Sequence, residues 1–305
     1  MKILLARPRG FCAGVDRAIN IVRETLTIYG PPIYVKHAVV HNRHVIESLK
    51  QQGAVFVEEI QEIPEGSRVI FSAHGTSPAV FDEARKRNLA IIDAVCPLVT
   101  KVHNEVVRYA KEGYTILLIG HKGHVEVIGT SGEAPDNVLV IESAEEAERI
   151  EVPEPAKLAY TTQTTLSVDD AKDIIAVLRR RFPHIVGPSK SDICYATQNR
   201  QEAVKKLAER ADVIFIIGSR ESSNSNRMVG VARSCGTKAY LIDGPADINP
   251  EMFSADTTVG ISSGASTPEY VVQEVIKRLR ACGASSIEKL EGKEERIRFP
   301  LPVIQ

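Results

Sequence analysis

Short apolar runs alternate with longer amphipathic patterns along almost the whole chain, and this alternation constrains the fold more than any other feature. The predicted strands are Lys2–Ala6, Ile33–Lys36, Val55–Val57, Arg68–Ser72, Ile91–Asp93, Thr115–Ile119, Val138–Ile141, Leu158–Thr161, Val213–Ile217, Ala239–Ile242 and Thr258–Ile261. The predicted helices are Val15–Tyr29, Val99–Lys111, Ser167–Arg181, Asn199–Arg210, Ser225–Cys235 and Pro268–Cys282. This alternation is typical of α/β proteins, in which helices cover both faces of parallel sheets.

The positions of three cysteines suggest how these elements are grouped. Cys12, Cys96 and Cys194 divide the chain into segments that are each long enough for a small α/β unit. We therefore expect three small parallel-sheet α/β lobes that meet at a common centre. The predicted lobes span residues 1–96, 97–193 and 194–282, and residues 283–305 form a tail that returns towards the first lobe.

The five cysteines fall at two chemically different kinds of helix end. Cys12, Cys96 and Cys194 precede predicted helices, whereas Cys235 and Cys282 end predicted helices and are each followed by a glycine. A helix N-terminus has free N–H groups and a partial positive charge, and so it favours a thiolate, the form that binds metals. We expect the first three sulfurs to act together and the other two to be small buried side chains.

Three thiolates leave several kinds of site open. Zinc sites usually contain a close cysteine pair, and this chain has no CxxC pair. A purely electron-transferring [4Fe–4S] cluster has four cysteine ligands, so three would leave one iron available to a substrate. Three unrelated buried cysteines are the remaining alternative. The odd number and wide spacing of the cysteines favour the cytoplasm over a secreted disulfide framework.

Polar loops follow five of the predicted strands, at the sheet edge where parallel α/β proteins bind ligands. These loops are 73–77, 120–126, 162–165, 218–226 and 262–266. Their hydroxyl, amide and imidazole groups beside helix N-termini suit phosphate oxygens, although the same residue types also serve as ordinary helix caps. Glu126 is the acid of a loop rich in glycine and histidine, and its burial would make it a candidate proton donor.

Charge and hydropathy argue against several kinds of partner. The formal net charge of −1 gives no reason to expect nucleic acid or an anionic membrane as a partner. No apolar run approaches the roughly 20 residues that a membrane-spanning helix needs. The chain also lacks the GxxxxGK[ST] and GxGxxG motifs of nucleotide- and dinucleotide-binding folds.

Six motifs, in order along the chain, resemble those of the 4-hydroxy-3-methylbut-2-enyl diphosphate reductase family. They are RPRGFCAGV at 7–15, SAHG at 72–75, DAVCPLV at 93–99, TQTTLS at 162–167, DICYAT at 192–197 and SSNSN at 222–226. The resemblance implies three α/β lobes in a pseudo-threefold arrangement around a central iron–sulfur cluster. It also implies reductive removal of an allylic hydroxyl, which gives isopentenyl and dimethylallyl diphosphates. Reduced ferredoxin or flavodoxin would donate the electrons to a monomeric enzyme.

The resemblance also assigns roles to residues of this chain. Cys12, Cys96 and Cys194 would hold a [4Fe–4S] cluster whose fourth iron has no protein ligand and binds the substrate hydroxyl. Glu126 would supply the proton, and Thr164 and His124 would assist it. The implied substrate-binding residues are His41, His74, His124, Thr164, Ser222, Ser223, Asn224 and Ser266.

Two departures from the family pattern, and two rival functions, accompany this assignment. Val125 stands where many relatives have proline, which would leave the loop less constrained, and Glu221 stands where asparagine is common. A carboxylate at 221 would repel a diphosphate unless it points outward. The rival functions are a cluster-dependent dehydratase that needs no external electrons and a non-enzymatic iron–sulfur redox sensor.

Overall fold

A computed structural model describes residues 1–152 and 157–304 of the chain, which form two compact units. The first unit contains residues 1–16, 41–48 and 195–298, and the second contains 17–40, 49–194 and 299–305. Two helices continue from one unit into the other, α1 (Ala13–Tyr29) after Asp16 and α2 (Arg43–Gln51) after Ser48. Residues 153–156 of the second predicted lobe and Gln305 of the predicted tail lie outside the described residues.

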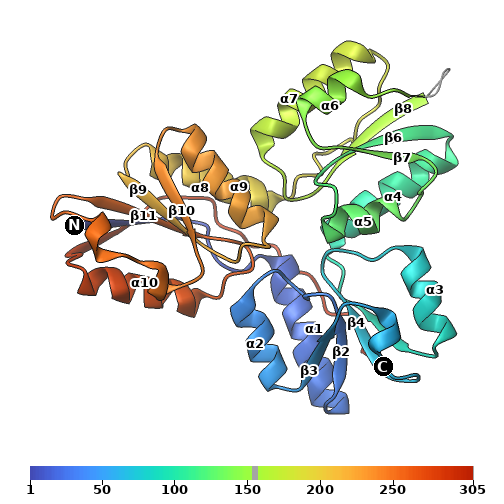
Figure 1. The fold of residues 1–305 in the computed structure, drawn as a ribbon, viewed down its shortest axis with the longest axis horizontal. Helices are drawn as coiled ribbons and strands as arrows, with labels where there is room; N and C mark the ends of the chain where they lie inside the picture. The colour runs from blue at the N-terminus through green and yellow to red at the C-terminus, as the bar shows by residue number, and fades with distance from the viewer. Residues whose placement is uncertain (153–156, 305) are drawn as a thin grey trace. The chain divides into compact units, whose positions relative to one another are not determined.

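The first unit is built on one parallel sheet with the strand order β10-β9-β11-β1-β12 (Figure 1). Its strands are β1 (Lys2–Leu5), β9 (Val213–Ile217), β10 (Lys238–Ile242), β11 (Thr258–Ser263) and β12 (Ser286–Lys289). The first strand of the chain thus lies between two of its last strands, with Lys2 opposite both Thr258 and Ser286. Parallel pairing places the carboxyl ends of β1, β9 and β11 at one edge of this sheet.

Helices cover both faces of this sheet because its strands alternate apolar side chains between the two faces. Ile3, Leu5 and Phe215 pack against α10 (Glu269–Ala281), while Leu4 and Ile216 pack on the opposite face. The helices on that opposite face are α8 (Tyr195–Ala208) and α9 (Ser223–Ser234). Two short 3₁₀ turns, Pro245–Asp247 and Pro250–Met252, complete the unit.

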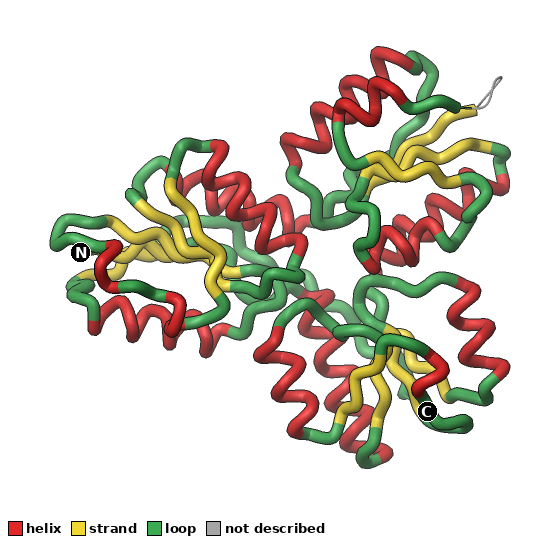
Figure 2. The backbone as a smooth tube through the Cα atoms, in the orientation of Figure 1, coloured by secondary structure: helices red, strands yellow, loops and turns green. Residues whose placement is uncertain are grey.

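The second unit contains two smaller parallel sheets, with the strand orders β3-β2-β4-β5 and β7-β6-β8. The strands are β2 (Ile33–Lys36), β3 (Ala54–Val57), β4 (Arg68–Phe71), β5 (Ala90–Asp93), β6 (Tyr114–Ile119), β7 (Val138–Ile141) and β8 (Lys157–Thr162). The helices are α3 (Pro78–Lys86), α4 (Pro97–Lys111), α5 (Val125–Ser131), α6 (Ala144–Arg149) and α7 (Val168–Arg181), with a 3₁₀ turn at Ile60–Glu62. Figure 2 shows the strands in yellow and the helices in red.

Each sheet of the second unit has its own apolar core. Phe71 and Val69 of β4 pack with Ala84 of α3. Leu117 and Ile119 of β6 pack with α6 and α7, and Ile116, on the other face, packs with Val106 and Tyr109 of α4. Helix α4 therefore joins the two sheets, because its N-terminus follows β5 and its apolar side chains contact β6 and β8.

The predicted fold class, an α/β protein with three small parallel sheets, is confirmed. Strand β1, which the sequence analysis placed in the first lobe, instead pairs with β11 and β12, so that part of the lobe assignment is wrong. The predicted tail contributes an edge strand, β12, beside β1. Helices α2, α3, α5 and α6 were not predicted; they have only six to nine residues each, too few for a clear helical period.

Within the described residues, no helix combines the length and the apolar character that crossing a membrane requires.

Candidate active site

Glu126 is a deeply buried acid held by two hydrogen bonds from one residue. Its side chain is 3% exposed, and its two carboxyl oxygens accept from the Thr164 backbone N–H at 2.6 Å and from the Thr164 hydroxyl at 3.0 Å. Burial raises the pKa of Glu126 to about 7, and the nearby Asp192 carboxylate adds to this while the bonds from Thr164 oppose it. Sequence analysis placed Glu126 in a loop, whereas the structure places it in the first turn of α5.

His124 caps that helix and is thereby fixed in one protonation pattern. Its Nδ1 accepts a hydrogen bond from the Glu126 backbone N–H at 3.1 Å, which makes His124 the N-cap of α5. An accepting Nδ1 places the ring hydrogen on Nε2, so the neutral imidazole offers an N–H donor on its other side. The ring of His74 lies edge-on to that of His124, with centroids 6.0 Å apart. The second unit therefore brings together His74, His124, Glu126 and Thr164.

Two of the three predicted sulfur ligands are tied to these same loops through their backbones. The Cys194 N–H donates to the Thr164 carbonyl at 3.0 Å, and the Cys96 N–H donates to the Ala73 carbonyl, beside His74, at 3.0 Å. Cys96 is the N-cap of α4, and Cys194 directly precedes α8. Both sulfurs thus sit at helix N-termini beside the polar loops that carry the predicted catalytic side chains.

A network around the buried carboxylate of Asp192 supports the loop that carries Cys194, and sequence reasoning missed it. The side chain of Asp192 has no exposed surface, and it accepts from the Thr161 hydroxyl at 2.8 Å and the Thr162 N–H at 3.0 Å. Its other oxygen pairs with Lys101 of α4 at 2.6 Å. Asp192 therefore links the segment before Cys194 both to the end of β8 and to α4.

In the first unit, the N-terminus of α9 presents a hydroxyl cluster at the carboxyl end of the sheet. Ser222 is the N-cap of α9, and its hydroxyl accepts from the Ser225 N–H at 3.3 Å and from the Ser225 hydroxyl at 3.0 Å. Gly218 and Gly264 allow this approach, because an added Cβ at either position would lie within 2.3 Å of the Ser225 hydroxyl oxygen. A helix N-terminus lined with hydroxyl groups is suited to bind a phosphate group.

His41, Asn224 and Ser266 lie on segments that belong to the same unit. The Ser266 hydroxyl donates to the His41 carbonyl at 3.0 Å, which joins the loop after β11 to the residues before α2. Asn224 is 5% exposed, and its Oδ1 is a buried acceptor with no hydrogen-bond partner among the described residues. Glu221 is exposed, so its carboxylate is directed to solvent rather than into this cluster.

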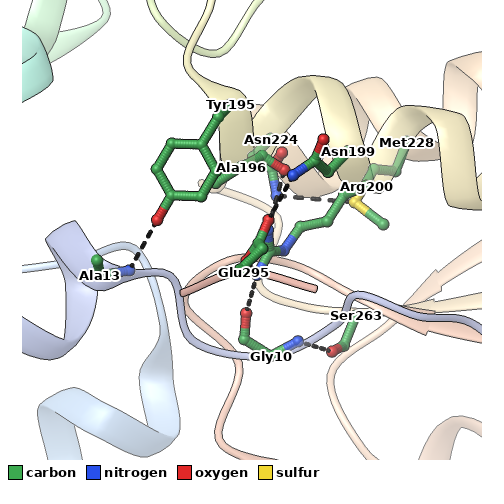
Figure 3. Close-up of polar contacts among 10 residues, drawn as sticks. All are labelled: Gly10, Ala13, Tyr195, Ala196, Asn199, Arg200, Asn224, Met228, Ser263 and Glu295. Carbon is green, nitrogen blue, oxygen red and sulfur yellow. Dashed lines mark hydrogen bonds and ion pairs between the residues drawn. The ribbon is translucent and has the colours of Figure 1, made fainter. Parts of the chain in front are cut away.

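Cys12 is held in the first unit by bonds from both sides of its loop. Its N–H donates to the Ala265 carbonyl at 3.2 Å, beside Ser266, and its carbonyl accepts from the Asp16 N–H in the first turn of α1. The next residue, Ala13, donates to the hydroxyl of Tyr195 at 3.3 Å. Figure 3 shows this bond together with the contacts of Gly10 described below. All three predicted ligands therefore precede helices and donate to a strand-end loop.

The other two cysteines end helices, as predicted. Cys235 is the C-cap of α9 and Cys282 the C-cap of α10, and the glycine after each has a positive φ. Cys282 packs against the core of its unit, but Cys235 is exposed, so the prediction that it is a buried side chain is wrong.

The three cysteines at helix N-termini have the chemistry of iron–sulfur cluster ligands. In the two described ranges, no three His, Cys, Asp or Glu side chains converge on a point that one ion could occupy. The thiolates of a cluster each bind a different iron, so they need not converge in this way. Among the described residues, Cys12, Cys96 and Cys194 form no disulfide, and they are partly exposed and placed at helix N-termini, as thiolate ligands require.

Comparison with known proteins gives one consistent family. The model of the LytB protein family matches residues 3–280. The chain is 56% identical, over 99% of its length and 96% of the relative's, to a 4-hydroxy-3-methylbut-2-enyl diphosphate reductase of Aromatoleum aromaticum. It is 54% identical, over 99% of its length and 96% of the relative's, to the protein of the same name from Klebsiella pneumoniae.

Solved structures give the same result. The E-1-hydroxy-2-methyl-but-2-enyl-4-diphosphate reductase from Plasmodium falciparum is 40% identical and superimposes with a TM-score of 0.93, over 99% of this chain and 95% of that one. A structure described as (E)-4-hydroxy-3-methyl-but-2-enyl diphosphate reductase, the terminal enzyme of the non-mevalonate pathway, is 34% identical with a TM-score of 0.64. That match covers 92% of this chain and 99% of the other.

Proposed function

The chain belongs to the LytB protein family, and from this premise we propose that it is a 4-hydroxy-3-methylbut-2-enyl diphosphate reductase. Its substrate is a small allylic diphosphate. In the reaction the allylic C–O bond breaks and a C–H bond forms at one of the two ends of the allyl group. Two electrons and two protons are consumed, and the oxygen leaves as water, which yields isopentenyl or dimethylallyl diphosphate.

The observation that carries the proposal is the buried Glu126–Thr164 pair. Hydroxide is a poor leaving group, so the departing oxygen needs a proton. Because burial raises the pKa of Glu126 to about 7, a substantial fraction of this carboxyl is protonated at neutral pH. The Thr164 hydroxyl is 3.0 Å from one Glu126 oxygen, so it can orient both the acid and the oxygen that receives the proton.

The remaining residues of the second unit orient the reacting end of the substrate. His124 is held by the Glu126 N–H so that its Nε2–H is available as a donor to a substrate oxygen. His74, whose ring lies edge-on to that of His124, would bind the substrate beside it.

The first unit anchors the diphosphate. Ser222, Ser223 and Asn224 form the first turn of α9, where free N–H groups and the helix dipole favour negative charge. Ser266 and His41 belong to adjoining segments of the same unit. The diphosphate is not changed in the reaction, so its binding energy serves to orient the distant allylic carbon.

Cys12, Cys96 and Cys194 would hold a [4Fe–4S] cluster. When bound, this group supplies the electrons and an iron that has no protein ligand. A reduced ferredoxin or flavodoxin would deliver the electrons, to a monomeric enzyme of the cytoplasm.

An anaerobic turnover assay tests the proposal. Purified protein is mixed with the allylic diphosphate, with and without a reduced one-electron mediator, and the products are identified. We expect isopentenyl and dimethylallyl diphosphates only when the mediator is present, with two electrons used for each product formed. Equal turnover without the mediator would indicate a dehydratase. No turnover in either mixture would contradict the proposed enzyme activity.

A further inference from the structure

The loop that carries Cys12 is held by an arginine whose charge is balanced by the C-terminal tail. Arg200 of α8 is fully buried, and one of its guanidinium N–H groups donates to the Gly10 carbonyl at 2.6 Å. The same guanidinium forms a forked pair with Glu295, at 3.0 and 3.2 Å to its two oxygens (Figure 3). These contacts lie within the first unit and join residues from three distant parts of the chain.

Gly10 is the point at which this network meets the cysteine loop. Its φ of +70° is open to few other residues, and its N–H donates to the Ser263 hydroxyl at 2.9 Å (Figure 3). Both polar groups of the Gly10 backbone are thereby fixed, two residues before Cys12. Because Cys12 is itself bonded to the loop after β11, the path of the chain from 10 to 12 is set at both ends.

Glu295 is what keeps Arg200 in this position. A fully buried guanidinium without a counter-ion is strongly unfavourable, so loss of Glu295 would drive Arg200 to move towards water or other acceptors. Asn199 also donates to Glu295, at 3.1 Å, which fixes the carboxylate from a second direction. Glu294, the preceding residue, is exposed and pairs with Arg296, two residues further along the chain, so it provides a matched control.

We propose that Glu295, acting through Arg200 and Gly10, is a positioning residue that holds the Cys12 thiolate for metal ligation. The C-terminal tail then helps to position a ligand of the cluster. Residues that orient metal ligands without binding the metal commonly affect metal retention almost as much as the ligands do. This inference rests on the proposed function, because it takes Cys12 to be a cluster ligand.

A cavity beside the loop indicates what loss of the ion pair between Glu295 and Arg200 would change. Phe11, which precedes Cys12, and Glu295 both line a cavity of about 500 Å³ on the first unit. If the tail no longer held Arg200, the loop from Gly10 to Cys12, which contributes Phe11 to this cavity, would be free to shift. Water and dioxygen would then reach Cys12 more easily.

The test compares holoenzymes purified without oxygen. Iron and acid-labile sulfide are measured for the wild type and for Glu295→Gln and Glu294→Gln, and the visible absorbance is followed after exposure to air. We expect Glu295→Gln to lose its cluster on the order of 10-fold faster than the wild type, and Glu294→Gln to match the wild type. Wild-type protein without iron would instead overturn the proposed function.

Two further variants separate positioning from loss of stability. Arg200→Met combined with Glu295→Gln removes both charges and the bond to Gly10, so it should fold but still lose its cluster quickly. Val275→Ala lowers the Tm of the same unit through a core cavity and should keep the wild-type rate of cluster loss. The inference is overturned if both Glu295 variants lose the cluster at the wild-type rate. It is also overturned if Val275→Ala, at an equal fall in Tm, loses its cluster as fast as the two Glu295 variants do.

Discussion

The two units of the chain carry different chemistry at comparable places in their folds. In both, polar side chains gather at the carboxyl ends of parallel strands and at helix N-termini. The second unit presents a titratable acid, Glu126, fixed by Thr164 inside a buried site. The first presents hydroxyl and amide groups around the start of α9. Under the proposed function, the second unit would move a proton and the first would bind an anion, so changes in them should affect kcat and KM separately.

The largest effect should follow from removing the acid of the second unit. Glu126→Gln keeps the shape and the bond from the Thr164 N–H but cannot donate an acidic proton. We expect kcat to fall on the order of 10²- to 10⁴-fold with KM and iron content unchanged. Steady-state kinetics with a reduced mediator measures this, with Glu145→Gln, an exposed acid on α6, as the control. Near wild-type kcat in Glu126→Gln would contradict the proposal that the second unit supplies the proton.

The pH dependence of kcat should follow the same carboxyl. Because burial raises the pKa of Glu126 to about 7, its acid form is present below that pH and is lost as the pH rises through it. The wild-type kcat should therefore fall about 10-fold for each pH unit well above 7. The residual activity of Glu126→Gln should not show this fall. A kcat that stays constant between pH 6 and 9 contradicts the assigned role.

The same pKa makes a prediction about folding stability. The ordinary pKa of a glutamate is 4.5, and the folded protein raises it to about 7 for Glu126, so folding favours the protonated form. This contribution is fully present below pH 4.5 and is lost as the pH rises through 7. Relative to Glu126→Gln, the wild type should lose on the order of 3 kcal/mol over that range. Urea unfolding at pH 5 and pH 8 measures the difference, and equal differences at both would contradict it.

In the first unit, loss of a hydroxyl should weaken binding rather than the chemical step. Ser222→Ala should raise KM about 10-fold or more and leave kcat nearly unchanged, since a hydrogen bond to a charged group is lost. The variant also loses an N-cap, at a cost of about 1 kcal/mol in stability. Ser167→Ala is the matched control, because Ser167 caps α7 in the same way, through the Asp170 N–H. If Ser167→Ala raises KM as much, the effect comes from stability alone.

The smallest effect is expected at the departure from the family pattern in the second unit. Val125 is the first residue of α5, a position that suits proline, and His124 before it has the extended backbone that a following proline needs. Val125→Pro should therefore change kcat and KM by less than about twofold and raise stability by a few tenths of a kcal/mol. A large loss of kcat would show that the backbone N–H of Val125 takes part in the site.

The sequence was sufficient for the features that depend on local pattern. The alternation of apolar runs with amphipathic patterns predicted parallel sheets, and the spacing of three cysteines predicted that there are three. The helix ends predicted which cysteines lie at N-termini. The polar loops after the strands, including those of Glu126 and Ser222, were also visible. Helix α5 was missed because its seven residues include Gly129, so Glu126 was taken for a loop residue.

The remaining features depend on contacts between distant residues, which no local pattern contains. The pairing of β1 with β11 and β12 joins the two ends of the chain. The bond of Glu295 to Arg200 spans 95 residues, and that of Lys101 to Asp192 spans 91. Charged residues of these types are usually solvated, so only the structure shows that one member of each pair, Arg200 and Asp192, is buried.

Iron and sulfide analysis of single cysteine variants tests the central claim most directly. Wild-type protein purified without oxygen should contain about four irons and four sulfides per chain, as a [4Fe–4S] cluster requires. Cys12→Ser, Cys96→Ser and Cys194→Ser should each lose most of this iron, whereas Cys235→Ser, at an exposed helix C-terminus, should keep it. Full iron content in any of the first three variants, or its loss in Cys235→Ser, would contradict the account.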